Sequence, residues 1–429
     1  MSHRINIGHY QATAEEKDAV MTVLESGRLS PDEQVRSFEE EFSLRHSCTH
    51  GVMVNSGTDA LRIALAALKE RGQWQDNDVV FVPAITFVAT ANIVLQNKLT
   101  PYFIDIGIAG DYGINADRLA HFLNCSPSLR RRARAIMAVH LFGQPCDIGK
   151  VMDVARKYNL RVIEDSCETM GITYGDSPAR SVGSFGDIAC FSSYSCHLIQ
   201  TGVGGIATTS DPVLADLMRS YANHGRDTAY IPGYSKPDLS RELLKKRFRF
   251  VREGYSSRVT EMQAALARVQ LRHLPETILR RNQVAGRLLD ALEPYQDQLH
   301  LPYPCQFPVR EHAYMMFPIC VEGLNRADLC FHLEQNGIET RELLPLINQP
   351  CYTRLVKAQL KWNLEKDFPV ATVVNRTGFY VASHPGLTES DISFMTQTIG
   401  AFIEKGRKVS TTKRRIEVLH EPITAAQAA

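Results

Sequence analysis

Residues 187–209 read DIACFSSYSCHLIQTGVGGIATT, in which two apolar runs flank a polar segment with one histidine, His197. The apolar runs at 187–192 and 204–209 predict buried strands. The glycines between them allow a tight turn or a close approach of the backbone to a ligand. A lone histidine is more often a packed structural residue than a catalyst, so the role of His197 depends on the rest of the chain.

Further strand-like runs alternate with helical segments before this stretch. Residues 13–27 predict a helix, since Thr13 and Glu16 match a capping box and Gly27 a C-terminal cap. Another helical pattern continues through 61–68. The predicted strands are 79–83, 101–106, 134–140 and 161–165. Near-continuous apolar strands separated by helices are typical of an α/β fold, with a mostly parallel sheet covered on both faces.

A long helical pattern from about residue 261 predicts the connection to a smaller second domain. Within that part, 317–322 is typical of a strand and 327–337 of a helix, which indicates a compact α+β unit. The expected division is a large cofactor-binding domain at 1–275, a small C-terminal domain at 276–405 and a flexible tail at 406–429.

The composition limits the class of protein. The formal net charge of the 429 residues is +1, which gives no overall attraction to nucleic acid or to an anionic membrane. No stretch approaches the about 20 apolar residues of a spanning helix, and no signal peptide is evident, so we expect a cytoplasmic protein. Residues 236–252 are strongly basic. We interpret them as a solvated face, with a contact to a phosphorylated ligand as the alternative.

Three polar stretches fall at the carboxyl ends of strands, where parallel α/β sheets bind ligands. Ser56, Gly57 and Thr58 begin a helix, which favours a phosphate, although serine and threonine are also ordinary N-caps. Asp165 ends a buried strand and needs a cationic partner. A protonated pyridine nitrogen or a structural ion pair would serve equally well. The third stretch is the segment that carries His197.

Taken in order, these segments resemble the DegT/DnrJ/EryC1/StrS family of sugar aminotransferases and dehydratases, which has the fold type I architecture of pyridoxal phosphate (PLP) enzymes. The resemblance extends to about residue 405. It rests on NSGTDALRIAL, FVPAITFVATAN, PYFIDI, VHLFGQPCDI, VIEDSCETMG, SFGDIACFSSYSCH, TGVGG, NHGR, GYSSRVTEMQAAL and GIETR. It implies a homodimer with shared active sites.

The resemblance implies a cradle for the cofactor. The residues that match its phosphate site are Ser56, Gly57, Thr58 and Ser192. Phe87 matches the aromatic residue that stacks on the pyridine ring, and Asp165 matches the acid that pairs with the pyridine nitrogen. Glu168 stands where the family usually has glutamine or histidine near the ring oxygen.

Most members of the family have lysine at the position of His197. A histidine cannot bind PLP covalently, so the resemblance implies a cofactor held non-covalently, most naturally as pyridoxamine phosphate (PMP). One branch with this change contains 3-dehydratases of nucleotide-linked 4-keto-6-deoxy sugars, and its tyrosine three residues earlier matches Tyr194. In such an enzyme His197 would take a proton from the C4′ carbon of the cofactor and assist departure of the C3 hydroxyl. Glutamate would be the amino donor.

Other matches and departures bear on the site. Some dehydratases of that branch hold an iron–sulfur cluster, but this chain has no cysteine between Cys196 and Cys305, so we expect neither cluster nor metal. Val203 replaces a common glutamate. The family's asparagine from the partner subunit is absent, and Ser256 or Arg258 would have to contact the phosphate instead.

Two further residues match family motifs, namely His224 in NHGR and Arg341 in GIETR. Each is a candidate for substrate binding, with a structural role as the alternative. The leading hypothesis is a PMP-dependent C3 dehydratase of a nucleotide-linked keto sugar. The alternatives are an aminotransferase-like enzyme without a covalent cofactor, and a cofactor-binding regulator or partner subunit.

Overall fold

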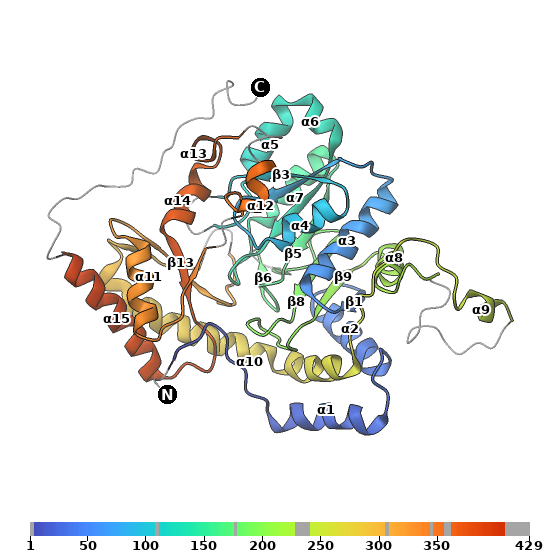
Figure 1. Ribbon diagram of the computed structural model, residues 1–429, viewed down its shortest axis with the longest axis horizontal. Coiled ribbons are helices and arrows are strands. Elements are labelled where there is room, and N and C mark those ends of the chain that lie inside the picture. Colours follow the sequence, from blue (N-terminus) through green and yellow to red (C-terminus); the bar gives the residue numbers. More distant parts are fainter. Residues whose placement is uncertain are drawn as a thin grey trace.

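The computed structural model (Figure 1) describes residues 4–107, 111–175, 178–227, 241–304, 309–343, 346–355 and 362–407. The start of the basic segment 236–252 lies outside these ranges. So does the predicted tail 406–429, apart from the end of the last helix.

A seven-stranded sheet forms the centre of the large part of the chain. Its strands, in spatial order, are β1 (His50–Val54), β9 (Gly205–Thr209), β8 (Ile188–Ser192), β5 (Arg161–Asp165), β4 (Ala133–Val139), β2 (Val79–Pro83) and β3 (Thr100–Ile104). Neighbours from β8 to β3 are parallel, whereas β9 is antiparallel to both β1 and β8. The predicted mostly parallel sheet is therefore confirmed, and six of its strands lie within two residues of their predicted bounds. Strand β1 had not been predicted.

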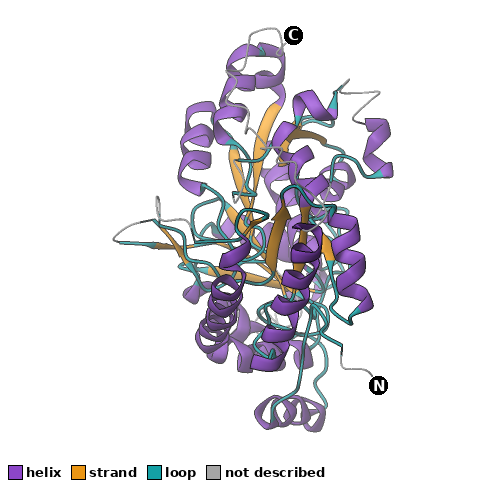
Figure 2. Ribbon diagram, turned by 90° about the vertical axis from the view of Figure 1, so that its left-hand side faces the viewer, coloured by secondary structure: helices purple, strands orange, loops and turns teal. Residues whose placement is uncertain are grey.

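Helices cover both faces of this sheet, as Figure 2 shows. One apolar core joins the sheet to α3 (Gly57–Gly72), α4 (Ala89–Gln96) and α8 (Pro212–Ala222). A second core joins the opposite face to α2 (Glu33–Arg45), α5 (Ala116–Cys125), α7 (Ile148–Tyr158) and the first half of α10 (Glu261–Leu292). This burial on both faces explains why the strands are apolar throughout rather than alternating.

The N-terminal helix α1 (Ala14–Ser26) begins as its sequence predicts. The Thr13 hydroxyl accepts a hydrogen bond from the Glu16 amide at 3.2 Å, and the Glu16 carboxylate accepts one from the Thr13 amide at 2.7 Å. Gly27 ends the helix at φ 68°, in the left-handed region that glycine adopts readily. The smaller elements of the large part are α6 (Pro127–Arg132), β6 (Thr173–Tyr174), β7 (Arg180–Ser181) and α9 (Arg241–Lys246).

Helix α10 connects the large part to a second, antiparallel sheet (Figure 1). This sheet has the order β10 (Leu299–His300), β11 (Phe317–Val321), β13 (Gly378–Val381) and β12 (Arg341–Glu342). The helical elements of this part of the chain are η1 (Glu293–Tyr295), α11 (Arg326–Gln335), α12 (Pro350–Arg354), α13 (Leu364–Asp367), α14 (Pro369–Thr377) and α15 (Glu389–Arg407). The expected boundary at residue 275 falls inside α10, at Pro275, and remains a prediction. No helix within the described ranges is long and apolar enough to cross a membrane.

Candidate active site

A cavity of about 730 Å³ opens at the carboxyl ends of the parallel strands. Its walls come from the ends of β5 and β8, the start of α3, the segments that follow β2 and β4, and the second sheet. Ten of the thirteen residues predicted for the site line it, namely Ser56, Gly57, Thr58, Phe87, Asp165, Glu168, Ser192, Tyr194, His197 and Arg341. Their individual roles remain predictions.

The start of α3 forms part of one wall of the cavity. Ser56 is the N-cap, and its hydroxyl accepts a hydrogen bond from the Asp59 amide at 3.1 Å. A Cβ atom on Gly57 would lie 2.7 Å from Cβ of Ser192 and 2.8 Å from Sγ of Cys167, so only glycine lets α3 start this close to β8. The exposed amide groups and the helix dipole at this position favour a phosphate.

Asp165 ends β5 with its side chain at the cavity wall and only 5% of the residue exposed. Its carboxylate accepts hydrogen bonds from the Thr90 hydroxyl at 2.8 Å and from the Cys167 amide at 3.4 Å. Within the described ranges no basic side chain forms an ion pair with it, and burial raises its pKa above the ordinary value. A protonated pyridine nitrogen would supply the missing cation, so the residues present fit the cofactor that the family uses.

Glu168 lies three residues beyond Asp165 in the same wall. Its carboxylate accepts a hydrogen bond of 2.6 Å from the Phe142 amide. Burial raises the pKa of Glu168 to about 7, the Phe142 amide opposes this rise, and the negative charge of Asp165 adds to it. Near neutral pH this carboxyl is protonated in part of the molecules. In the protonated form it can donate a hydrogen bond to an acceptor in the cavity.

His197 lies in the loop between β8 and β9. This loop is closed at its base, where Ser193 accepts a backbone hydrogen bond from Thr201 at 2.9 Å and the two hydroxyl groups lie 2.7 Å apart. Nδ1 of His197 lies 3.1 Å from the carbonyl oxygen of Ser192. Because a carbonyl only accepts, Nδ1 carries the proton and Nε2 is left with a free lone pair. The pKa of His197 is lowered to about 4, mainly because the ring is buried. The hydrogen bond to Ser192 opposes this fall, and the positive charge of Arg281 adds to it.

Two exposed aromatic side chains line the cavity, and one of them contacts His197. Tyr194 is 51% exposed, and its ring meets the imidazole edge-on with 6.1 Å between the ring centroids. Phe87 follows β2, is 56% exposed and also lines the cavity. An exposed aromatic ring at a cavity wall is suited to stacking on a planar ligand.

Three predicted residues do not reach the cavity. Arg258 donates hydrogen bonds to Nε2 of His224 at 3.1 Å and to the Ser256 hydroxyl at 3.2 Å, so these side chains form an exposed cluster of their own. Val203 is also outside the lining, and its carbonyl accepts a hydrogen bond from the Gln263 side chain at 2.6 Å. A contribution of the cluster to the partner subunit's cavity remains a prediction.

The cavity also has lining residues that had not been predicted. The N-terminal segment 6–10 lines it, and the Ile7 amide donates a hydrogen bond to the Glu339 carboxylate at 2.8 Å. His9 is held by stacking on His384, with 5.2 Å between the ring centroids. Glu339 also pairs with Arg341. The sequence offers no signal for this arrangement, since it depends on contacts between the N-terminal segment and residues more than 300 positions away.

Comparison with known proteins identifies the family. The model of the DegT/DnrJ/EryC1/StrS aminotransferase family matches residues 10–399. The chain belongs to this family. GDP-perosamine synthase from Caulobacter vibrioides is 30% identical over 394 residues, covering 91% of this chain and 95% of that protein. The dTDP-4-dehydro-2,6-dideoxy-D-glucose 3-dehydratase from Saccharopolyspora spinosa is 28% identical, covering 88% of this chain and 82% of that protein.

The fold has solved counterparts as well. The structure of Escherichia coli GDP-4-keto-6-deoxy-D-mannose-3-dehydratase with bound hydrated PLP superimposes with a TM-score of 0.78 at 24% identity, covering 93% of this chain and all of that one. The predicted fold type I architecture is therefore confirmed. The chain is an enzyme of a PLP-dependent family whose members are aminotransferases and dehydratases of nucleotide-linked sugars.

Proposed function

We propose that this protein is a PMP-dependent C3 dehydratase of a nucleotide-linked 4-keto-6-deoxy sugar, in which His197 is the acid/base. The observation that carries the proposal is the imidazole itself, which lines the cavity and has its Nδ1 bound to the Ser192 carbonyl, so that the lone pair of the ring is on Nε2. No lysine is among the described residues that line this cavity. A cofactor there would be bound without a covalent bond to the protein.

The binding residues suit the two ends of such a cofactor. The α3 terminus with Ser56, Gly57 and Thr58 would hold its phosphate, and Asp165 would hold its ring nitrogen in the protonated form. PMP, when bound, supplies an amine for the sugar ketone and a ring that withdraws electrons. Glu168, which exchanges its proton near neutral pH, would face the ring oxygen.

His197 then has a defined task. Because its pKa is about 4, the imidazole is neutral at pH 7 and Nε2 can accept a proton from the carbon next to the cofactor ring. The protonated ring can deliver that proton to the departing C3 hydroxyl. General acid–base assistance of this kind contributes roughly 10²–10⁴-fold to the rate. The proposal further includes glutamate as amino donor, a homodimer in the cytoplasm and no iron–sulfur cluster.

The test supplies PMP, glutamate and candidate 4-keto-6-deoxy sugar nucleotides to the purified protein. Dehydration releases ammonia and yields a 3-deoxy sugar. A second candidate, transamination, is favoured by the aminotransferase description of the family. It would give a stable amino sugar without ammonia, and that result would replace the first proposal. Binding of PMP without turnover of any candidate sugar would favour a partner subunit with altered activity.

A further inference from the structure

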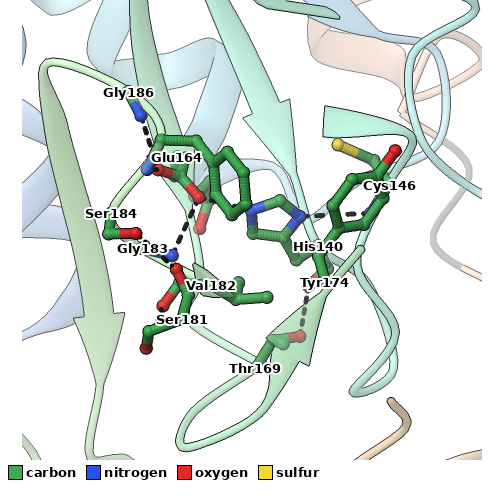
Figure 3. Close-up of polar contacts among 12 residues, drawn as sticks. His140, Cys146, Glu164, Thr169, Tyr174, Ser181, Val182, Gly183, Ser184 and Gly186 are labelled. Carbon is green, nitrogen blue, oxygen red and sulfur yellow. Dashed lines mark hydrogen bonds and ion pairs between the residues drawn. The ribbon is translucent and has the colours of Figure 1, made fainter. Parts of the chain in front are cut away.

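A second carboxylate, that of Glu164, precedes Asp165 in β5 and has a different environment. Figure 3 shows the surroundings of Glu164. Since successive side chains of a strand point to opposite faces, Glu164 points away from the cavity, and it is completely buried. It accepts four hydrogen bonds, from the amides of Gly183, Phe185 and Gly186 at 2.7–2.8 Å and from Nε2 of His140 at 3.1 Å. Burial raises the pKa of Glu164, but His140 and these amides lower it more, so the carboxylate is charged.

His140, which follows β4, is also completely buried and is bonded at both ring nitrogens (Figure 3). Nδ1 accepts a hydrogen bond from the Cys146 amide at 3.1 Å, so Nε2 carries the proton and donates it to Glu164. The imidazole therefore closes the turn of residues 140–146 at both of its ends and anchors it to β5.

The main chain of His140 connects this turn to the cavity wall. Its amide donates to the carbonyl oxygen of Asp165 at 3.0 Å. Its carbonyl oxygen accepts a hydrogen bond from the Thr169 hydroxyl, also at 3.0 Å. These two bonds bracket the segment 165–169, which carries both acidic residues predicted to face the cofactor ring.

The closed turn contains a backbone conformation that needs support. Phe142 has φ 59°, a left-handed value that is uncommon for a bulky residue, and Gly143 follows at φ 95°. In this conformation the Phe142 amide reaches the Glu168 carboxylate at 2.6 Å. A relaxed turn would lose this contact. The strained residue is therefore Phe142, whose amide binds Glu168. It lies between residues 140 and 146, which the His140 ring connects.

We propose that Glu164 and His140 are positioning residues, which hold the 140–146 turn so that the Phe142 amide meets Glu168 and Asp165 stays directed into the cavity. The proposal rests on the cofactor-binding roles proposed above for Asp165 and Glu168. It does not depend on which reaction the sugar undergoes.

The test compares Glu164→Gln and His140→Asn with wild type by titration with PMP and by the absorption spectrum of bound PLP. Second-layer residues that orient ligands in metal sites change affinity by about 10–100-fold, and we expect a tenfold or larger rise in the Kd for PMP with a shifted PLP absorption maximum. His46→Asn is the matched control. His46 is equally buried and bonded at both ring nitrogens, to the Phe42 carbonyl at 2.9 Å and the Gly171 amide at 3.2 Å, but it does not line the cavity.

The control variant should lower the melting temperature but leave the Kd and the PLP spectrum unchanged. If the Kd for PMP and the PLP spectrum change equally in all three variants, or change in none of them, the Glu164–His140 pair has no specific effect on the cofactor site and the proposal is wrong. If the Glu164 and His140 variants do not fold, wild-type protein with ¹⁵N-labelled histidine gives the answer. The chemical shift of the His140 ring N–H group should change when PMP is added, while that of His46 should not. An unchanged chemical shift of His140 would contradict the proposal. These readouts need no sugar, so they stand even if dehydration is not observed.

Discussion

The imidazole of His197 donates its Nδ1 proton to the carbonyl oxygen of Ser192 at 3.1 Å. Ser192 is the last residue of β8, so the ring is oriented by the backbone of the central sheet. A backbone carbonyl stabilises a charged imidazole far less than a carboxylate would, and burial therefore lowers the pKa of His197 to about 4. The imidazole is therefore neutral near pH 7, as the proposed role of His197 as a base requires.

Replacement of His197 should separate catalysis from cofactor binding. We expect His197→Asn to bind PMP with little change, since the phosphate and ring residues are untouched, but to release ammonia roughly 10²–10⁴-fold more slowly. His197→Lys should bind PLP covalently, seen as a shifted absorption band that borohydride makes permanent. A variant that binds PLP without any such band would show that this position does not face the reactive carbon.

The pH dependence of activity should lack the usual histidine limb. Because the pKa of His197 is lowered from 6.5 to about 4, the free base persists down to about pH 4, and kcat/KM should not fall between pH 7 and 5 through this group. Initial rates across this range in constant ionic strength provide the measurement. A limb centred near pH 6.5 that disappears in His197→Asn would mean that the ring is solvated.

Glu168 should titrate in the range where His197 does not. Its pKa is raised from 4.5 to about 7, so the folded state binds its proton more tightly than the unfolded chain. This contribution to stability is complete below pH 4.5 and is lost as pH rises through about 7. We therefore expect Glu168→Gln, which stays neutral, to gain stability relative to wild type above pH 7. Urea unfolding at pH 5 and pH 8 measures the difference, and equal gains at both pH values would contradict it.

The contact between α3 and β8 should not tolerate a methyl group. A Cβ atom on Gly57 would overlap Ser192 and Cys167, and overpacking of this kind costs about 1–3 kcal/mol. We expect Gly57→Ala to lower the free energy of unfolding and to weaken PMP binding, since the phosphate site would widen. Gly286→Ala is the matched control, because Gly286 lies inside α10 with nothing within 4 Å of its Cβ position. That substitution should stabilise the protein by about 0.5–1 kcal/mol.

Local signals in the sequence were sufficient for the elements whose stability is local. The apolar run of β5 and the capping box of α1 occur where the pattern predicts them. Strand β1 escaped prediction because its short run begins with histidine and glycine and is stabilised by antiparallel pairing with β9. Whether a strand runs parallel or antiparallel depends on the strands beside it, and the periodicity of its own sequence carries no information on this.

The same distinction holds for the cavity. Asp165 ends β5 and His197 follows β8, and the ends of these parallel strands meet at one edge of the sheet, so their proximity could be anticipated. The bond from the Ile7 amide to Glu339 joins residues 332 positions apart, and no local pattern encodes it. The partnership of Glu164 with His140 was equally hidden, because a buried acid and a buried histidine reveal their relation only once the strands are packed.

Removal of the charge at Asp165 should produce opposite effects on stability and on cofactor binding. With no basic side chain paired to it in the described part of the chain, this buried carboxylate has a raised pKa and its charge is unfavourable at neutral pH. We expect Asp165→Asn to raise the melting temperature of the cofactor-free protein. We expect the same variant to weaken PMP binding about tenfold or more, since a charged hydrogen bond of about 1.5–3 kcal/mol is lost.

Asp105→Asn supplies the comparison. Asp105 is also a buried carboxylate after a strand, but it accepts hydrogen bonds from the amides of Ile106, Val370 and Ala371 at 2.9–3.0 Å and lies outside the cavity lining. Burial raises the pKa of Asp105 as well, but these three amides oppose the rise. Its replacement should lower the melting temperature, because asparagine keeps only one acceptor oxygen for the three amide donors, and it should leave the Kd for PMP unchanged. If Asp165→Asn instead behaves like Asp105→Asn in both measurements, Asp165 is a structural acid, and the cationic ring nitrogen must be held elsewhere.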